Sequence, residues 1–242
     1  MKGVIPAAGR GTRMRPFTKA YPKELLPVGE KAVIEHGIND LKNAGITEIC
    51  VVVGWKQHAI LDYLGSGKRF GVDITYKVQD QRNGLATAIR CAESFVGDES
   101  FAVVLGDNYV DDKSALNDLK EFHERKGFEA TIGAFRPEDV TSYGVIDPGE
   151  NNLVEGMVEK PNVEDAPSNI AISGLYIFES SIFKAIDDIG VSDRDEYELT
   201  DAIDLVRKET GKVGYRDIKG SRIDVGTPER LREANKEFDH RD

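Results

Sequence analysis

The chain has 242 residues, 40% of them hydrophobic and 31% charged, which is ordinary for a globular protein and is enough for one large buried core. The formal net charge of −11 argues against a nucleic-acid partner or an anionic membrane surface. No apolar run approaches the ~20 residues that a membrane helix needs, and the N-terminus lacks the apolar segment of a signal peptide, so we expect a cytoplasmic protein.

Strand-like runs alternate with helical patterns through the first half of the chain. Strands are expected at 3–6, 48–54, 72–78 and 101–105, and helical periodicity lies between them around 34–45, 60–64 and 85–92. Strand followed by helix, repeated, predicts right-handed βαβ units and a mostly parallel sheet.

The rhythm changes after Phe128, where strands follow one another closely. We expect strands at 128–135, 144–146, 153–158 and 170–178, a helix near 199–208, a strand near 212–218 and a last helix after Pro228. No linker or internal repeat divides the chain. The pattern therefore predicts one α/β domain over 1–242, with a nucleotide-type half at about 1–127 and a strand-rich half at about 128–242.

The loop after the first strand, "AAGRGTRMRP", combines glycines with arginines. Residues 1–31 carry a local charge of +5, whereas the rest of the chain carries −16. The loop lacks the Gly-Lys-Ser/Thr ending of a Walker loop, and Met14 stands where a dinucleotide fingerprint needs its third glycine. A loop at the carboxyl end of a strand, with free N–H groups and a forked arginine cation, indicates a site for a small polyanion such as a triphosphate.

Two longer motifs, Ala7 to Met14 and Pro22-Lys23-Glu24-Leu25-Leu26-Pro27-Val28, resemble the signature of the sugar-1-phosphate nucleotidyltransferases. They are most similar to the glucose-1-phosphate thymidylyltransferase branch. Shorter matches follow in order along the chain: Gly106-Asp107-Asn108, Tyr143-Gly144-Val145, Glu159-Lys160-Pro161, Glu196 to Asp201, and Asp224-Val225-Gly226-Thr227-Pro228.

The resemblance implies a Rossmann-like, glycosyltransferase-A-type fold, with a mixed, mostly parallel sheet flanked by helices. It also implies an enzyme that joins dTTP or UTP to a sugar 1-phosphate, glucose 1-phosphate first among them, and releases pyrophosphate. Two unit charges 4 Å apart repel by about 4 kcal/mol at an effective dielectric of 20. Such a reaction therefore needs cations on both substrates, and it needs little acid–base machinery because the attacking oxygen is already ionised.

The resemblance also assigns residues. It gives Arg13 to the leaving phosphates and Lys23 to the α-phosphate as catalytic residues, and it gives Mg²⁺ to Asp107 and Asp224. It places the nucleotide on Ala8, Gly9, Gly11, Thr12, Gln79 and Gly84, and the sugar phosphate on Leu85, Tyr143, Gly144, Glu159, Lys160 and Gly174. Without the other motifs, Asp107 would be read as a turn residue.

The nucleobase is predicted from Gln79, which ends a strand five residues before Gly84. A carboxamide offers a donor and an acceptor, the complement of the imide edge of thymine or uracil. This pairing favours dTTP or UTP over the other triphosphates. The choice between the two is left open, with dTTP slightly favoured by the motifs.

The chain departs from the family pattern at three places. Pro6 stands where an apolar residue is usual and Ala8 where a glycine is usual, and Arg222-Ile223 precede Asp224 where the thymidylyltransferases often carry a tryptophan. The last departure leaves the identity of the sugar open. The four histidines lack ligand spacing, which disfavours zinc, and Cys50 and Cys91 are expected to be buried free thiols.

Two other functions stay open. A glycosyltransferase would use a nucleotide sugar, but its usual Asp-x-Asp motif is absent near Asp107. A non-catalytic nucleotide-sensing subunit would keep the fold, but it would have no need of the complete set of charged motif residues. A homo-oligomer is a further possibility, and the lack of a β-helix extension predicts no acetyltransferase activity.

Overall fold

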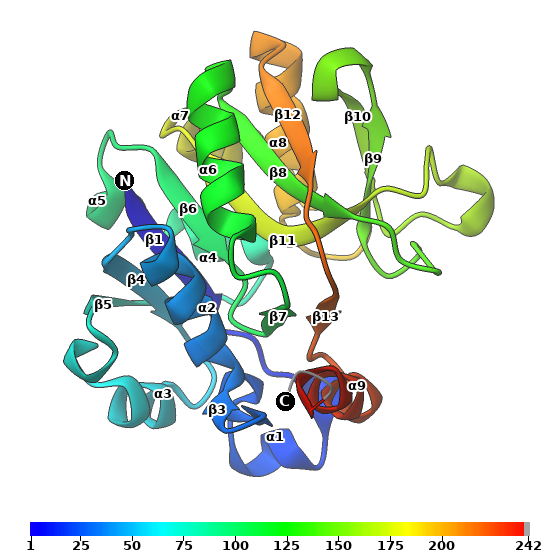
Figure 1. Ribbon diagram of the computed structural model, residues 1–242. Coiled ribbons are helices and arrows are strands. Elements are labelled where there is room, and N and C mark those ends of the chain that lie inside the picture. The colour runs from blue at the N-terminus through cyan, green and yellow to red at the C-terminus, as the bar shows by residue number, and fades with distance from the viewer. Residues whose placement is uncertain (240–242) are drawn as a thin grey trace.

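The computed structural model describes residues 1–239 and has a central sheet with helices on both faces (Figure 1). In the first half, β1 (Lys2–Ala7), β4 (Glu48–Val53), β5 (Asp73–Val78) and β6 (Phe101–Val104) pair in parallel in the order β6-β1-β4-β5. The predicted strands of this half are confirmed. Their nearly continuous apolar sequence reflects burial on both faces, because helices cover both sides of a parallel sheet.

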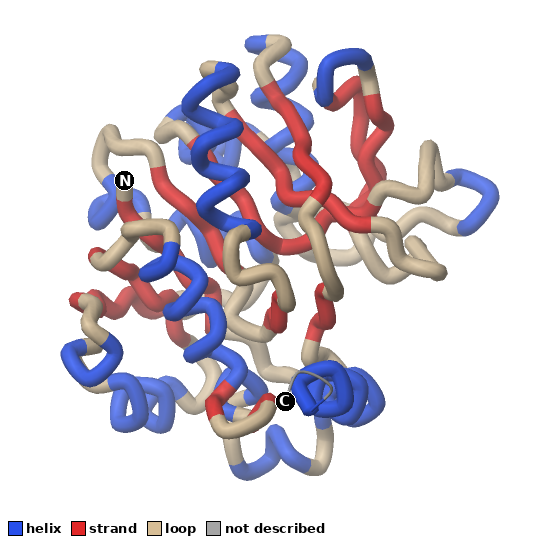
Figure 2. The backbone as a smooth tube through the Cα atoms, in the orientation of Figure 1, coloured by secondary structure: helices blue, strands red, loops and turns tan. Residues whose placement is uncertain are grey.

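The second half extends the same sheet with mostly antiparallel strands (Figure 2). β11 (Ala171–Phe178) runs antiparallel to β6 and joins the two halves. One end of β11 reaches the pair of β9 (Gly144–Pro148) and β10 (Val154–Glu159), and its length pairs with β8 (Ala130–Phe135), which carries β12 (Val213–Asp217). The register of β11 against β8 shifts between Ile172 and Tyr176, where Gly174 has φ +85°. The predicted mixed α/β fold is confirmed.

Strand alternation divides the apolar side chains between two cores. Val4 and Cys50 face one side of the sheet, where they pack with α4 (Leu85–Arg90), α5 (Glu93–Val96), α7 (Ser181–Asp188) and α8 (Leu199–Thr210). Ile5 and Val51 face the other side, with α2 (Val33–Asn43), α3 (Gln57–Leu64) and α6 (Ala115–Lys126). The sequence analysis did not predict α6 or α7.

A third, smaller core lies below the edge of the sheet. It joins two short strand pairs, β2 (Pro27–Val28) with β3 (Lys31–Ala32) and β7 (Asn108–Val110) with β13 (Arg222–Asp224), to the C-terminal helix α9 (Pro228–Asp239). Met14 of the first loop is fully buried in this core, beside Tyr109 and Val225. Figure 1 shows α9 and α1 (Phe17–Ala20) at this end of the molecule. The third core therefore anchors the basic loop to the segment that carries Asp224.

Both cysteines are free, as predicted, but only Cys50 is buried, and Cys91 is partly exposed. Among residues 1–239, no helix combines the length and the apolar character needed to cross a membrane.

Candidate active site

Two cavities adjoin one another where the parallel strands end. The larger has a volume of about 720 Å³ and the smaller about 180 Å³. Leu85, Leu105 and Glu196 border both. The carboxyl edge of the sheet is where open α/β folds bind ligands.

The basic loop forms one wall of the larger cavity. Ala8, Gly9, Gly11 and Thr12 border it, together with Lys23. Gly11 has φ +57°, which is the left-handed region that glycine adopts without strain, and its carbonyl accepts a hydrogen bond from Thr18 Oγ1 at 2.7 Å. The loop is thus held by its own backbone and by the burial of Met14, while its glycine N–H groups stay without side-chain cover.

Gln79 and Gly84 lie together in the opposite wall. Gln79 is 5% exposed, and its Nε2 donates to Gly84 O at 3.0 Å and to Thr87 Oγ1 at 2.9 Å. Because a backbone carbonyl can only accept, this contact decides which way the amide points. Within the described residues, Gln79 Oε1 receives no hydrogen bond, and Gln79 borders the larger cavity. Gly84 has φ +137°, and a Cβ there would collide with the backbone of Tyr197.

Asp107 and Asp224 are brought together by the β7–β13 pair. Asp224 pairs with Asn108 in the register, and Val225 N donates to Asp107 O at 2.9 Å. Lys23 forms an ion pair with Asp107. Burial opposes ionisation of both groups, but the pair holds the pKa of Asp107 below its ordinary value, and the surrounding carboxylates hold the pKa of Lys23 above its own.

Asp224 is in a different electrostatic state. Burial and then repulsion from Asp107 raise its pKa, against the opposing charges of Arg222, Lys23 and Arg13. Its Oδ1 is buried and has no hydrogen-bond partner among residues 1–239. A bound cation would satisfy this oxygen and favour the charged form of the carboxylate. No group of three potential metal ligands occurs in the described chain, but Mg²⁺ in phosphate enzymes takes one or two carboxylates plus substrate oxygens, so two acids fit.

Glu24 is a third buried carboxyl group at the larger cavity. It is 1% exposed, and its Oε2 has no hydrogen-bond partner within the described residues. Burial raises the pKa of Glu24 to about 7, although Lys23 lowers it. The sequence analysis did not single out this residue, since a glutamate beside a lysine is typical of an exposed ion pair.

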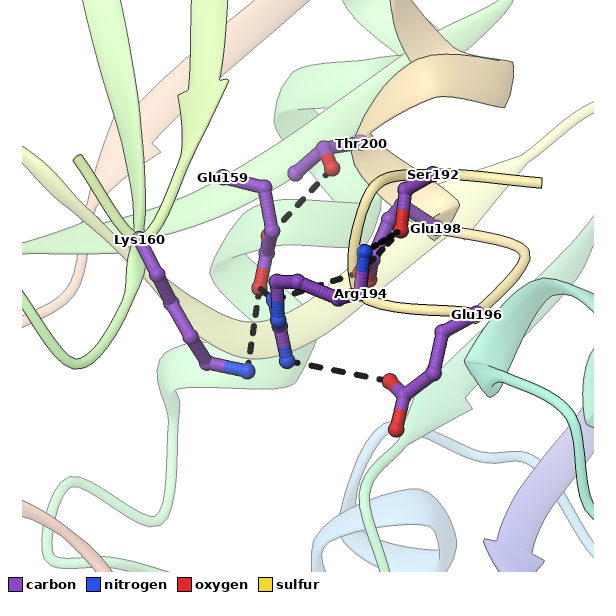
Figure 3. A network of polar contacts seen from close by, with 7 residues as sticks. All are labelled: Glu159, Lys160, Ser192, Arg194, Glu196, Glu198 and Thr200. Atoms are coloured by element: carbon purple, nitrogen blue, oxygen red, sulfur yellow. Dashed lines mark hydrogen bonds and ion pairs between the residues drawn. The ribbon is translucent and has the colours of Figure 1, made fainter. Parts of the chain in front are cut away.

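A network of ion pairs lies at the smaller cavity (Figure 3). Of the residues drawn there, Glu159, Lys160, Glu196, Glu198 and Thr200 border the cavity. Lys160 Nζ and Arg194 Nη1 both lie 3.3 Å from Glu159 Oε1. Arg194 also lies 3.2 Å from Glu198 and 3.7 Å from Glu196, and Thr200 Oγ1 donates to Glu159 Oε2 at 3.2 Å. Two cations therefore converge on one carboxylate from different segments of the chain.

The remaining predicted residues also border the smaller cavity. They are Arg13, Leu85, Tyr143, Gly144 and Gly174. Leu85 borders the larger cavity as well, whereas Arg13 borders only the smaller one of the two. Arg13 and Asp224 both lie close to Gly226. A Cβ at Gly226 would lie 3.0 Å from Asp224 Oδ1 and 3.2 Å from Arg13 Nη2. The structure thus places Arg13 at the smaller cavity, beside Asp224, and its role toward the leaving phosphates stays a prediction.

Several residues at and beside this cavity were not predicted. Arg222 borders the cavity and Arg194 contacts its acidic lining, and neither was assigned a role. Glu198 and Thr200, within the motif from Glu196 to Asp201, were not assigned a role either. In the structure Glu198 and Thr200 are each 6% exposed. Thr200 is the second residue of α8 and stands next to buried apolar residues, which was the one sequence signal that its side chain is buried. Its partner Glu159 lies about 40 residues away, and sequence spacing does not show this contact.

Comparison with known proteins gives concordant results. The family model described as Nucleotidyl transferase matches residues 2–241. A low-salt glycan biosynthesis nucleotidyltransferase, Agl11 of Haloferax volcanii, is 41% identical over 236 residues, which are 97% of this chain but only 65% of that protein. The chain therefore spans about two thirds of the length of this relative.

The chain covers a larger share of two further proteins. The UTP–glucose-1-phosphate uridylyltransferase YngB of Bacillus subtilis is 37% identical over 253 residues, covering 93% of this chain and 84% of that protein. A solved UDP-glucose pyrophosphorylase in complex with UDP-glucose superposes with a TM-score of 0.91 at 31% identity, covering 100% of this chain and 99% of that one.

Proposed function

Because this chain belongs to the nucleotidyl transferase family, we propose that it joins UTP to a sugar 1-phosphate, glucose 1-phosphate first, and releases pyrophosphate. The main observation behind the proposal is that two adjoining cavities, each with cationic or N–H groups, meet at one pair of carboxylates. Asp107 borders the larger cavity, Asp224 borders the smaller, and one backbone hydrogen bond connects their segments.

The larger cavity would hold the nucleoside triphosphate. The N–H groups of the loop from Gly9 to Thr12 suit the phosphates, and Gln79 Oε1 suits the N3–H donor of uracil. Cytosine presents an acceptor at N3 and would face this oxygen with no proton between them. The relatives named for UTP favour uracil over thymine as the base, and dTTP is the second candidate.

The smaller cavity would hold the sugar 1-phosphate. Lys160 borders it, Arg194 lies beside it, and both are engaged with Glu159. Binding of a phosphate dianion would exchange these internal ion pairs for substrate contacts. Glu159 would then be free to accept hydrogen bonds from sugar hydroxyls.

In the reaction, an oxygen of the sugar phosphate attacks the α-phosphorus of UTP. A new phosphorus–oxygen bond forms, the bond to the β-phosphate bridging oxygen breaks, and pyrophosphate leaves with that bond's electron pair. No proton has to move, so positioning and charge stabilisation account for the rate. Lys23 and Arg13, on either side of the carboxylates, would neutralise the charge that develops. Mg²⁺ held by Asp107 and Asp224 would supply further neutralisation of the phosphates.

The test is a grid of UTP, dTTP, CTP, ATP and GTP against several sugar 1-phosphates, with pyrophosphate release as the readout and Asp224→Asn as the control. The proposal expects the highest rate with UTP and glucose 1-phosphate, and a rate near background for the variant. A wild type that prefers a purine triphosphate would refute the base assignment. Transfer of sugar from UDP-glucose without pyrophosphate chemistry would identify a glycosyltransferase instead.

A further inference from the structure

Arg222 is a buried cation that the sequence analysis noted only as a departure from the family pattern. It lies on β13 two residues before Asp224, so the two side chains leave the strand on the same face. Arg222 is 8% exposed, and it borders the smaller cavity together with Asp224.

Most of its guanidinium is fixed by contacts within the protein. Nε donates to Ser173 O at 2.7 Å and Nη2 donates to Asn108 Oδ1 at 2.7 Å. Asn108 Nδ2 donates to the same Ser173 carbonyl at 2.7 Å, which closes a triangle. The neighbouring Gly174 makes this triangle possible, because a Cβ there would collide with Asn108 Nδ2.

Two aromatic rings hold the guanidinium from the sides. Its central carbon lies 5.3 Å from the ring centre of Phe135 and 5.2 Å from that of Tyr143. Such contacts orient a planar cation as well as stabilise it. The side chain is therefore rigid before any substrate arrives.

One donor group is left over. Arg222 Nη1 is buried and has no hydrogen-bond partner within residues 1–239. A buried charged donor without a partner is costly, and a native protein retains one where a ligand supplies the acceptor. Arg222 also borders an outer cavity beside Tyr143, and it shares the face of β13 with Asp224, which borders the smaller cavity.

We propose that Arg222 is a specificity-determining residue, whose Nη1 donates a hydrogen bond to a hydroxyl oxygen of the sugar ring in the smaller cavity. The inference rests on the proposed function, since it needs a sugar 1-phosphate in that cavity. A site built to hydrogen-bond a hydroxyl discriminates strongly against the analogue that lacks it.

The experiment compares glucose 1-phosphate with its 2-, 3-, 4- and 6-deoxy analogues as substrates of wild type, Arg222→Gln and Arg222→Lys. In wild type, loss of the contacted hydroxyl is expected to lower kcat/KM by about 10- to 100-fold. In both variants this difference in kcat/KM is expected to disappear. The substitution lowers kcat/KM for glucose 1-phosphate, but it does not lower kcat/KM for the deoxy analogue that lacks the contacted hydroxyl. The KM for UTP is expected to stay unchanged.

Phe135→Leu is the matched control, because it removes one of the flanking rings and leaves the donor in place. It should lower kcat/KM for all the sugar phosphates by a similar factor. Arginine side-chain NMR on the wild type is a second measurement, which covers the case in which the Arg222 variants fail to fold. Nη1 signals that shift with glucose 1-phosphate, but not with one deoxy analogue, would support the contact.

Two results would overturn the proposal and leave Arg222 a structural residue. One is that the deoxy analogues lower kcat/KM as much in the Arg222 variants as in wild type, and the other is that the Nη1 signals do not shift when the sugar phosphate binds. A wild type that accepts no sugar 1-phosphate would instead refute the proposed function.

Discussion

The two cavities are built to hold anions in different ways. The larger one uses backbone, because Gly9, Gly11 and Gly84 lie at its surface, although Gly84 also packs against the backbone of Tyr197. The smaller one is bordered by side chains from distant segments, Glu159 and Lys160 among them, which pair with each other and with the neighbouring Arg194. The difference shows that the loop from Gly9 to Thr12 is encoded locally, whereas the contact of Gly84 with Tyr197 and the side-chain network exist only once the fold has assembled.

The difference extends to charge. Arg10 and Arg82 border the larger cavity, and neither takes part in an ion pair with any described residue. Lys160 at the smaller cavity and the neighbouring Arg194 are both paired with Glu159. A triphosphate can therefore enter the larger cavity without displacing an internal ion pair, but a sugar phosphate has to replace one in the smaller.

The largest effects are expected at the carboxylates that join the cavities. Asp107→Asn and Asp224→Asn should each lower kcat by about a thousandfold or more, since each removes a ligand for the charge-neutralising cation. Asp98→Asn, at an exposed loop, is the matched control and should be fully active. Steady-state kinetics over a range of Mg²⁺ concentrations would measure this, and full activity of either active-site variant in EDTA would refute the assignment.

The next largest effects are expected at Lys160 and Arg13, and they should fall on different kinetic constants. Lys160→Ala is expected to raise the KM for the sugar phosphate by about 10- to 100-fold, because a charge-assisted contact is lost, and to leave the KM for UTP unchanged. Arg13→Ala should instead lower kcat, because Arg13 lies beside Asp224 where the substrates meet. The exposed Lys126→Ala serves as the control. Equal changes in both KM values for the two variants would contradict this separation.

A smaller effect is expected at the nucleobase. Removal of the Gln79 carboxamide should reduce the preference for UTP over CTP by about tenfold, the cost of one buried mispaired group. The measurement is a competition between UTP and CTP with wild type and Gln79→Ala. An unchanged preference would remove Gln79 from the base site.

The smallest effect concerns the stability of the substrate-free protein. The pKa of Glu24 is raised from 4.5 to about 7 by burial, so the folded state binds its proton more tightly than the unfolded state. The contribution of the protonated Glu24 carboxyl to the free energy of unfolding is fully present below pH 4.5. It is lost as the pH rises toward 7, because the buried carboxyl must then ionise. Glu24→Gln should therefore gain about 5 °C in Tm relative to wild type between pH 5 and pH 8. Parallel Tm curves for the two proteins would show that Glu24 does not titrate in this range.

The sequence predicted what depends on local pattern. The βαβ order and the loop from Ala8 to Met14 could be read directly, because apolar runs and glycines mark them. The helix α6 was missed, although Leu116, Leu119 and Phe122 repeat at helical spacing.

What could not be predicted depends on contacts between distant segments. β7 and β13 are three residues long, too short for any periodicity, yet their pairing brings Asp107 and Asp224 together. The placement of Arg13 at the smaller cavity and the three-way hydrogen bonding of Arg222 have the same origin. Motif resemblance pointed to Asp107 and Asp224, but only the assembled fold shows that they lie side by side.

If the two cavities form one site, the sugar phosphate attacks the α-phosphate of the nucleotide directly. The most direct test uses glucose 1-phosphate labelled with ¹⁸O in its phosphate, incubated with UTP, Mg²⁺ and the wild-type protein, and follows the label by mass spectrometry. We expect all of the label in the nucleotide sugar and none in pyrophosphate. Label in pyrophosphate, or release of pyrophosphate in the absence of a sugar phosphate, would contradict it.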